Sequence, residues 1–176
     1  MRYFSAALFL CFFLLSACAT IPTKDIAINA DADPQVHFTS YKSYAWLATA
    51  GIMHDPEGKW EPPGYDVDAE IKFLIDSALR KRGWTENTIN PDVYVAYVVG
   101  VDMAALKLKE NQKTMISTLE NVPAGALLVV LIDARSGEAV WAGQATAEMQ
   151  EGLDMDTRKK RLDYAVTKML KQVPSE

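Results

Sequence analysis

The sequence predicts a two-layer α+β domain, in which two amphipathic helices pack on one face of a mainly antiparallel β-sheet. Two segments, 66–83 and 155–173, place apolar residues at helical spacing. The remaining apolar runs are rich in β-branched and aromatic residues and are bounded by turn residues, as strands are. The two helices need one common apolar surface, which a sheet supplies.

The segment 66–83 has the clearest helical signals. Apolar residues recur from Val67 to Leu79 along one helical face. Asp66 is a candidate N-cap, three cations over 80–82 lie in the last turn, and Gly83 suits the position after the C-cap. The second helix, 155–173, carries its own apolar stripe and is stopped by Pro174.

The predicted strands follow the order β-β-α-β-(β-β)-β-β-α. They cover 26–30, 44–47, 93–101, a hairpin within 102–123, 126–134 and 139–149. The strand 93–101 is apolar on both faces and should be central or covered. The hairpin should turn near 110–113, although 104–119 also fits a helix.

The connections favour an antiparallel sheet. Three Gly and three Pro mark 51–65 as a loop, and a turn is expected around 39–42. A short turn at 135–138 should hold Gly137 at positive φ. Consecutive strands would then be joined by tight turns. Three tryptophans (Trp46, Trp84 and Trp141) should fill the core, with an aromatic ligand cage as the alternative.

Composition excludes several classes of protein. The chain has 176 residues, of which 49% are hydrophobic, and its formal net charge is -5. It is long enough for one domain, too apolar to be disordered, and too acidic for a general nucleic-acid binder. Its two cysteines exclude a disulfide-dense scaffold. No nucleic-acid partner is expected.

The N-terminus has the form of an export signal. Arg2 precedes an unbroken apolar run, Ala6–Leu15, which would span about 15 Å as a helix and is too short to cross a bilayer. The residues Leu15, Ser16, Ala17 and Cys18 resemble the lipobox of bacterial lipoproteins. That resemblance implies cleavage between Ala17 and Cys18, with acylation of Cys18. The alternative is an ordinary secretory signal. The expected organisation is a signal peptide over 1–17, a lipidated tether over 18–25 and one domain over 26–176.

Acylation of Cys18 would place the protein in the bacterial cell envelope. Three acyl chains make a firm anchor, so the membrane is an expected partner, together with an unknown envelope protein. Ala19 rather than Asp follows the cysteine, which by resemblance to enterobacterial sorting favours the outer membrane, facing the periplasm. Cys11 is removed with the signal, so no disulfide within the mature chain is expected.

The ordered motifs of the mature chain resemble one bacterial lipoprotein family, domain of unknown function 4136. They run from Ile26 to Pro174 and comprise 38–47, Arg82-Gly83-Trp84, 90–97, 131–137 and 140–143. The segment 102–123 is longer than the family pattern. The resemblance implies an envelope lipoprotein and offers no established catalytic residues.

The sequence contains no recognisable catalytic or metal-binding motif. His37 and His54 lie far apart, and His54-Asp55 with Glu57 fits a solvated loop better than a cation site. There is no Gly-x-Ser-x-Gly, P-loop or Gly-x-Gly-x-x-Gly motif. Carboxylate pairs such as Asp154 and Asp156 do not stand out. We therefore expect no enzyme, no metal and no cofactor besides the covalent lipid on Cys18.

Several single residues have structural interpretations. Asp133 should accept backbone N–H bonds in its turn, and Gly100 and Gly143 should mark strand bends or bulges. The cations Arg158, Lys159, Lys160 and Arg161 occupy the first turns of the last helix, where they oppose the helix dipole. They fit a solvated face balanced by nearby acids; the alternative is a patch that contacts anionic headgroups, lipopolysaccharide or peptidoglycan.

The leading functional hypothesis is a non-catalytic, lipid-anchored domain that presents its surface to an envelope partner. The second is a small-ligand-binding module, with a pocket between sheet and helices or under the 51–65 loop. The third, less favoured, is a carboxylate-dependent envelope hydrolase. A packed sheet–helix interface would count against the second, and an even scatter of acids against the third.

Overall fold

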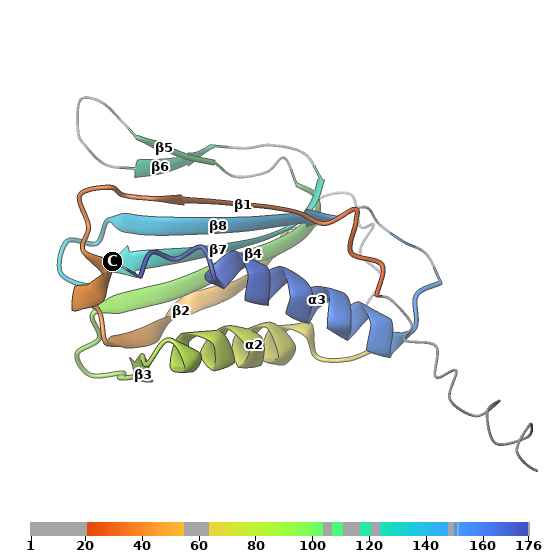
Figure 1. The fold of residues 1–176 in the computed structure, drawn as a ribbon, viewed down its shortest axis with the longest axis horizontal. Helices are drawn as coiled ribbons and strands as arrows, with labels where there is room; N and C mark the ends of the chain where they lie inside the picture. The colour runs from red at the N-terminus through yellow and green to blue at the C-terminus, as the bar shows by residue number, and fades with distance from the viewer. Residues whose placement is uncertain are drawn as a thin grey trace, which may run out of the picture.

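Six strands form one sheet, and helices α2 and α3 lie side by side on one face of it (Figure 1). The computed structural model describes residues 21–54, 64–103, 107–110, 117–120, 124–147, 150 and 152–175. The helices are α2 (Val67–Lys81) and α3 (Met155–Leu170), and a short 3-10 helix, η2, covers Phe38–Ser40. The strands of the sheet are β1 (Ala27–Ala32), β2 (Ser43–His54), β3 (Thr85–Glu86), β4 (Val93–Met103), β7 (Ala124–Asp133) and β8 (Ala139–Ala147). The predicted α+β architecture is confirmed.

The sheet is mostly antiparallel, but one side of it differs from the expected connections. Its strand order is β1-β8-β7-β4-β2-β3, and β2 runs parallel to both β3 and β4. The pairs β1–β8, β8–β7 and β7–β4 are antiparallel. The predicted order already placed a helix between β2 and β4, and α2 carries the chain back to the same end of the sheet, so these two strands pair in parallel. The expectation of tight turns between consecutive strands is wrong for β1 and β2, because β1 pairs with β8 at the edge of the sheet that lies opposite β3.

Several element bounds also differ from those predicted. β2 continues to His54, so the predicted loop 51–65 begins too early, and 55–63 lies outside the described residues. The register between β2 and β4 shifts between Trp46 and Gly51. Helix α3 ends at Leu170 instead of Val173, although Val173 still packs into the core. The two-residue strand β3 was not predicted.

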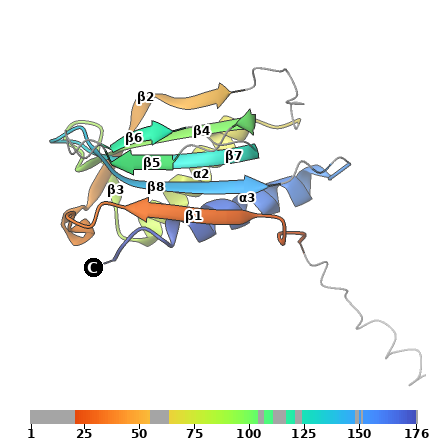
Figure 2. The same ribbon diagram turned by 90° about the horizontal axis from the view of Figure 1, so that it is seen from above.

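The ambiguous segment forms the expected hairpin. Strands β5 (Lys107–Glu110) and β6 (Ser117–Glu120) pair antiparallel, with Leu108 opposite Leu119. Most of the predicted turn lies outside the described residues. The hairpin lies on the side of the sheet away from the helices (Figures 1 and 2). A small buried cluster of Leu128, Val130 and Ala142 is separate from the main core.

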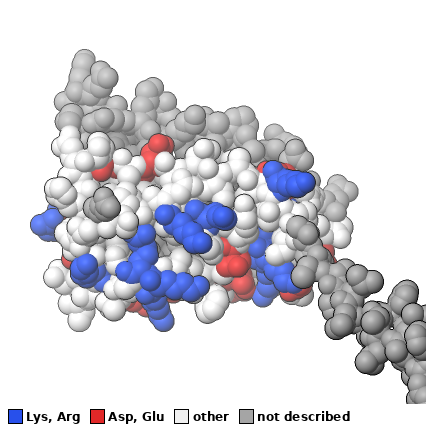
Figure 3. All heavy atoms as spheres, in the orientation of Figure 1, with Lys and Arg blue, Asp and Glu red and all other residues white. Residues whose placement is uncertain are grey.

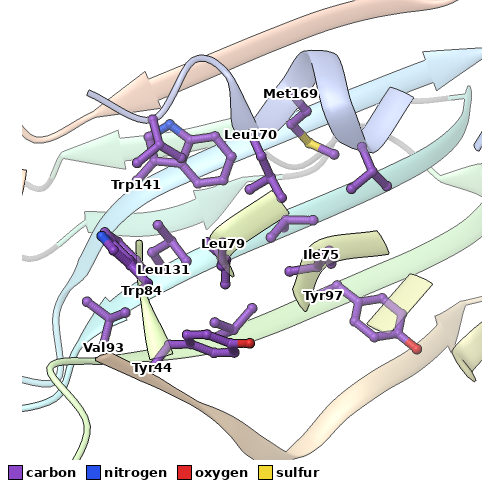
Figure 4. Close-up of a cluster of buried hydrophobic side chains, with 14 of the residues drawn as sticks. Tyr44, Ile75, Leu79, Trp84, Val93, Tyr97, Leu131, Trp141, Met169 and Leu170 are labelled. Carbon is purple, nitrogen blue, oxygen red and sulfur yellow. The ribbon is translucent and has the colours of Figure 1, made fainter. Parts of the chain in front are cut away.

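The main core fills the space between the sheet and the two helices (Figure 4). Val93, Val95 and Tyr97 alternate along β4 and are buried on one face, as the side-chain period of a strand requires. Helix α2 adds Ile71, Ile75 and Leu79, at the spacing of one helical face. Helix α3 adds Val166, Met169 and Leu170. As predicted, β4 is a central strand, between β7 and β2.

The helix ends confirm the predicted caps. The Asp66 side chain accepts a hydrogen bond from the Ala69 N–H at 3.0 Å, and Gly83 has φ +86° directly after the C-cap. At α3 the cap is Asp154, which was not predicted as one; its side chain accepts a hydrogen bond from the Thr157 N–H at 2.7 Å. Gly137, in the turn between β7 and β8, has φ +73° as expected.

Gly143 has a different role from the predicted bend. It lies on β8 two residues after Trp141, and a Cβ atom there would overlap the Trp141 ring and the Met169 side chain. Because it has no side chain, the fully buried indole of Trp141 can lie over the strand beneath α3. At Gly100 the bulge prediction is confirmed, since the β4–β7 register shifts between Gly100 and Met103.

We predict that Gly143→Ala lowers the free energy of unfolding by about 2 kcal/mol, because the new methyl group would force the indole ring or α3 to move. Urea denaturation would measure this loss. The matched control is Gly143→Ala combined with Trp141→Phe, whose smaller ring leaves room for the methyl group. The double variant should lose less than the sum of the two single changes. Strict additivity would contradict the proposed packing.

Candidate functional site

The predicted lipid-attachment site lies outside the described residues, but the segment that follows it is visible. Leu15, Ser16, Ala17 and Cys18 are not described, and the described chain begins at Ile21. Within the described residues, no helix is long and apolar enough to cross a bilayer. The nearest observable feature is therefore the place where residues 21–25 meet the domain.

Residues 22–25 are held against helix α3 by one arginine. The Arg161 guanidinium donates to both carboxylate oxygens of Asp25, at 2.9 and 2.6 Å. It also donates to the Pro22 carbonyl oxygen. The Arg161 and Asp25 side chains are only 9% and 14% exposed. This is a bidentate, nearly buried ion pair, which fixes geometry more firmly than a surface pair does. We call Arg161, Asp25 and Pro22 the tether clamp.

Arg161 does not lie on a solvated face, which was the favoured interpretation of its charged run. It precedes Ala165 by four residues and Met169 by eight, and both of these are buried on the inner side of α3. Helical periodicity therefore places Arg161 on the buried face. This spacing in the sequence already indicates that Arg161 points inward, where its charge needs a partner. The partner comes from a segment 136 residues away in the chain.

The other three cations of the run have separate partners. The Lys159 ammonium lies 3.0 Å from the Glu70 carboxylate on α2 and over the ring of Tyr65. Lys160 pairs with Asp156 one turn earlier, at 2.5 Å. The Arg158 side chain donates to the Leu153 carbonyl oxygen. The four cations therefore do not form one free patch. Headgroup contact by these residues stays a prediction, and the buried Arg161 is committed to the clamp.

Asp133 organises the turn between β7 and β8, as predicted. Its carboxylate accepts the N–H groups of Arg135 and Ser136, at 2.9 and 2.8 Å, and the Tyr41 hydroxyl at 2.8 Å. Burial would raise the pKa of this carboxyl, but the hydrogen bonds from Ser136, Tyr41 and Arg135 outweigh burial and hold it below its usual value. Asp133 is thus a charged structural acceptor.

Asp92 has a similar role next to the neighbouring strand, β4. It accepts the N–H groups of Lys42 and Ser43 and the Ser43 hydroxyl, each at 2.8 Å, and so joins the start of β2 to the start of β4. Despite the opposing effect of burial, these bonds lower its pKa. Among the residues that the structure describes, no group of three or more His, Cys, Asp or Glu could hold a metal ion. His54 is described only in its backbone, and the predicted loop residues Asp55 and Glu57 lie outside the description.

The tryptophans have core roles in this structure. Trp84 and Trp141 are buried, and Trp46 is half-buried against the core. The Trp46 Nε1 and the Tyr44 hydroxyl both donate to Asp76 Oδ1 on α2, at 3.1 and 2.8 Å. Burial and the bond to Asp76 raise the pKa of Tyr44 to about 12. These aromatic side chains attach α2 to the sheet.

We predict that Arg161→Gln releases the N-terminal segment and lowers the free energy of unfolding by about 3 kcal/mol, because Asp25 loses its nearly buried counterion. Hydrogen exchange over residues 22–26 should accelerate, and urea denaturation measures the loss. The control, Lys160→Gln, removes an exposed pair on the same helix and should change neither measurement appreciably. Unchanged exchange in Arg161→Gln would refute the clamp.

We also predict a pH-dependent effect of Asp133→Asn. Since the folded-state pKa of Asp133 is lowered, its stabilisation is present above about pH 4 and is lost as the pH falls through that folded-state value. At pH 7 the variant should lose about 1–3 kcal/mol of unfolding free energy. The difference from the wild type should shrink in urea denaturation at pH 3. Asp163→Asn, at an exposed position, is the control and should show little difference at either pH.

Comparison with known proteins identifies the family. No curated protein sequence matches the chain. A DUF4136 family protein from Bacteroides thetaiotaomicron aligns with a TM-score of 0.62 at 9% identity, over 85% of this chain and 96% of that one. A PDZ domain protein from Parabacteroides distasonis gives 0.54 at 14% identity, over 86% of this chain but only 36% of its own length.

A third solved structure of similar fold is the PelC dodecamer from Paraburkholderia phytofirmans. Its chain aligns with a TM-score of 0.50 at 13% identity, over 82% of this chain and 95% of that one. At such low identities these structures show that the fold is shared. The family model for the domain of unknown function DUF4136 matches residues 28–175, nearly the whole described domain. The chain therefore belongs to the DUF4136 family.

Proposed function

We propose that this protein is a lipoprotein of the bacterial envelope, anchored by acyl chains on Cys18, whose domain binds an envelope partner without catalysing a reaction. The observation that carries the proposal is the tether clamp. A lipobox-like sequence ends at Cys18, and only four residues later Arg161 holds Pro22 against α3. Four residues span at most about 14 Å. An acylated Cys18 would therefore keep the domain close to the bilayer.

Proximity to the membrane is what makes the clamp useful in this proposal. A flexible tether would let the domain turn freely, whereas a chain fixed at Pro22 and Asp25 limits the orientations that the domain can adopt. The N-terminal half of α3, which includes Arg161, then faces the membrane. The outer membrane, facing the periplasm, is the proposed location, because Ala19 rather than Asp follows the acylated cysteine.

The core packing favours this proposal over a ligand pocket between the sheet and the helices. That space holds large, fully buried side chains, among them Trp141, Ile75, Leu79 and Met169 (Figure 4). The carboxylates at the sheet end also favour a non-catalytic role. Asp92 and Asp133 are occupied by backbone N–H donors that stabilise their charged form, whereas a general acid needs a raised pKa.

We predict that Cys18→Ser abolishes acylation, because serine lacks the thiol that accepts the diacylglyceryl group. Metabolic labelling with a radioactive fatty acid, followed by purification of the protein, would measure this. The control, Cys11→Ser, changes the cysteine inside the signal and should label like the wild type. A Cys18→Ser protein that is still labelled and membrane-bound would overturn the proposed anchor.

A further inference from the structure

Cations gather at the end of the helical layer that lies away from the tether clamp. Helices α2 and α3 run in the same direction, so their C-terminal ends lie together (Figure 1). Arg80, Lys81, Lys168 and Lys171 lie at these ends, and all four are exposed. We call them the C-terminal cation cluster. Figure 3 shows Lys and Arg atoms gathered over this end of the helical face.

A half-buried arginine holds the two helix ends together. The Arg82 guanidinium, on the chain just after α2, donates to the Val173 carbonyl oxygen at 3.0 Å and to the Pro174 carbonyl oxygen at 2.5 Å. It also lies 5.8 Å from the centre of the Trp84 ring. Val173 is two residues beyond Lys171, so these bonds place Lys171 beside the end of α2.

Few carboxylates of the described chain lie close enough to neutralise the cations of the cluster. The protein is acidic, with a formal net charge of -5. Among the described residues, however, Glu86 is the only carboxylate within ion-pair distance of the cluster, at 3.9 Å from Arg80. Cations at helix C-termini stabilise the helix dipole, which accounts for their presence at the two helix ends. In the part of the chain that the structure describes, the three lysines of the cluster have no carboxylate within ion-pair distance, although the Lys168 ammonium lies 5.7 Å from the centre of the Tyr164 ring. These exposed positive charges can attract an external anion.

The surface chemistry fits a polymer with repeated anionic groups better than a protein. Protein interfaces depend on apolar and aromatic anchors that become buried. The exposed large apolar side chains of the described chain are Phe73, Ile89 and Met155, and none belongs to the cluster. Long lysine side chains on two adjacent helix ends can instead follow successive anions along an extended chain.

The cluster lies on the side of the domain away from the anchoring membrane, an inference that rests on the proposed function. Lys171 lies ten residues beyond Arg161, about 15 Å along α3. Charge interactions with headgroups are screened over about 8 Å at physiological salt. If the tether clamp lies near the bilayer, the cluster faces the periplasm. We propose that the C-terminal cation cluster binds the carboxylates of peptidoglycan, the repeating polyanion of that space.

The test uses the full chain, purified from envelope fractions in a non-ionic detergent. It is sedimented with isolated peptidoglycan sacculi at increasing NaCl, and separately with vesicles of phosphatidylethanolamine and phosphatidylglycerol. Lys168→Glu combined with Lys171→Glu should weaken sacculus binding about tenfold. The matched control reverses Lys24 and Lys160 to Glu, which are exposed and lie away from the C-terminal ends of the helices. It changes net charge equally and should bind like the wild type.

Three outcomes would overturn the proposal: no salt-sensitive sedimentation with sacculi, equal loss in the control variant, or stronger cluster-dependent binding to vesicles than to sacculi. Lys168→Gln with Lys171→Gln should give an intermediate loss, and unchanged circular dichroism would show that the variants fold. Fatty-acid labelling of the same preparations tests the anchor independently. Labelled protein that does not sediment with sacculi refutes the role of the cluster but not the lipid anchor. Unlabelled protein refutes the lipid anchor.

Discussion

The close packing of Trp141 over Gly143 sets the position of helix α3, and much of the remaining structure depends on that position. The indole is fully buried, and a side chain at Gly143 would overlap both its ring and Met169. A large aromatic side chain fits into a closely packed sheet–helix interface only where a neighbouring residue is small enough to leave room for it. Trp141 thereby fixes the separation between β8 and α3.

The fixed position of α3 links the two ends of the molecule. Near its start, the inward-pointing Arg161 meets Asp25 and holds the segment that leads into β1. At its far end, the carbonyl oxygens of Val173 and Pro174 meet Arg82 from α2. Both contacts join segments that are distant in the chain, and both use the multiple N–H donors of an arginine. One helix therefore carries both the proposed membrane-facing contact and the proposed polymer-facing surface.

The polar groups around the sheet act as structural acceptors. Asp92 and Asp133 accept backbone N–H groups at neighbouring strand ends, and Asp76 accepts from two aromatic side chains beneath α2. Carboxylates that receive several hydrogen bonds remain charged and are poor proton donors. The same acids that hold the strands in register are thus unsuited to the general-acid role that a carboxylate-dependent hydrolase would require.

The helices, most of the strands and the Asp66 cap follow from the sequence alone, because these features depend on local spacing. The apolar period of α2, the Asp66 cap, Gly137 and Asp133 in their turn all follow from residues within a few positions of each other. The family resemblance and the lipobox-like residues that end at Cys18 are also features of the sequence.

The partners of residues far apart in the chain are set by the packing of the folded domain. The parallel pairing of β2 with β4 follows from where α2 lies, and the edge position of β1 follows from its pairing with β8. The charged run predicts a solvated position for Arg161, whereas the structure places Arg161 on the buried face of α3. The sequence predicts a strand bend at Gly143, whereas the structure shows that the Trp141 ring occupies the space of its missing side chain. In each case a long-range contact outweighs the local pattern, because burial depends on neighbours that sequence spacing does not specify.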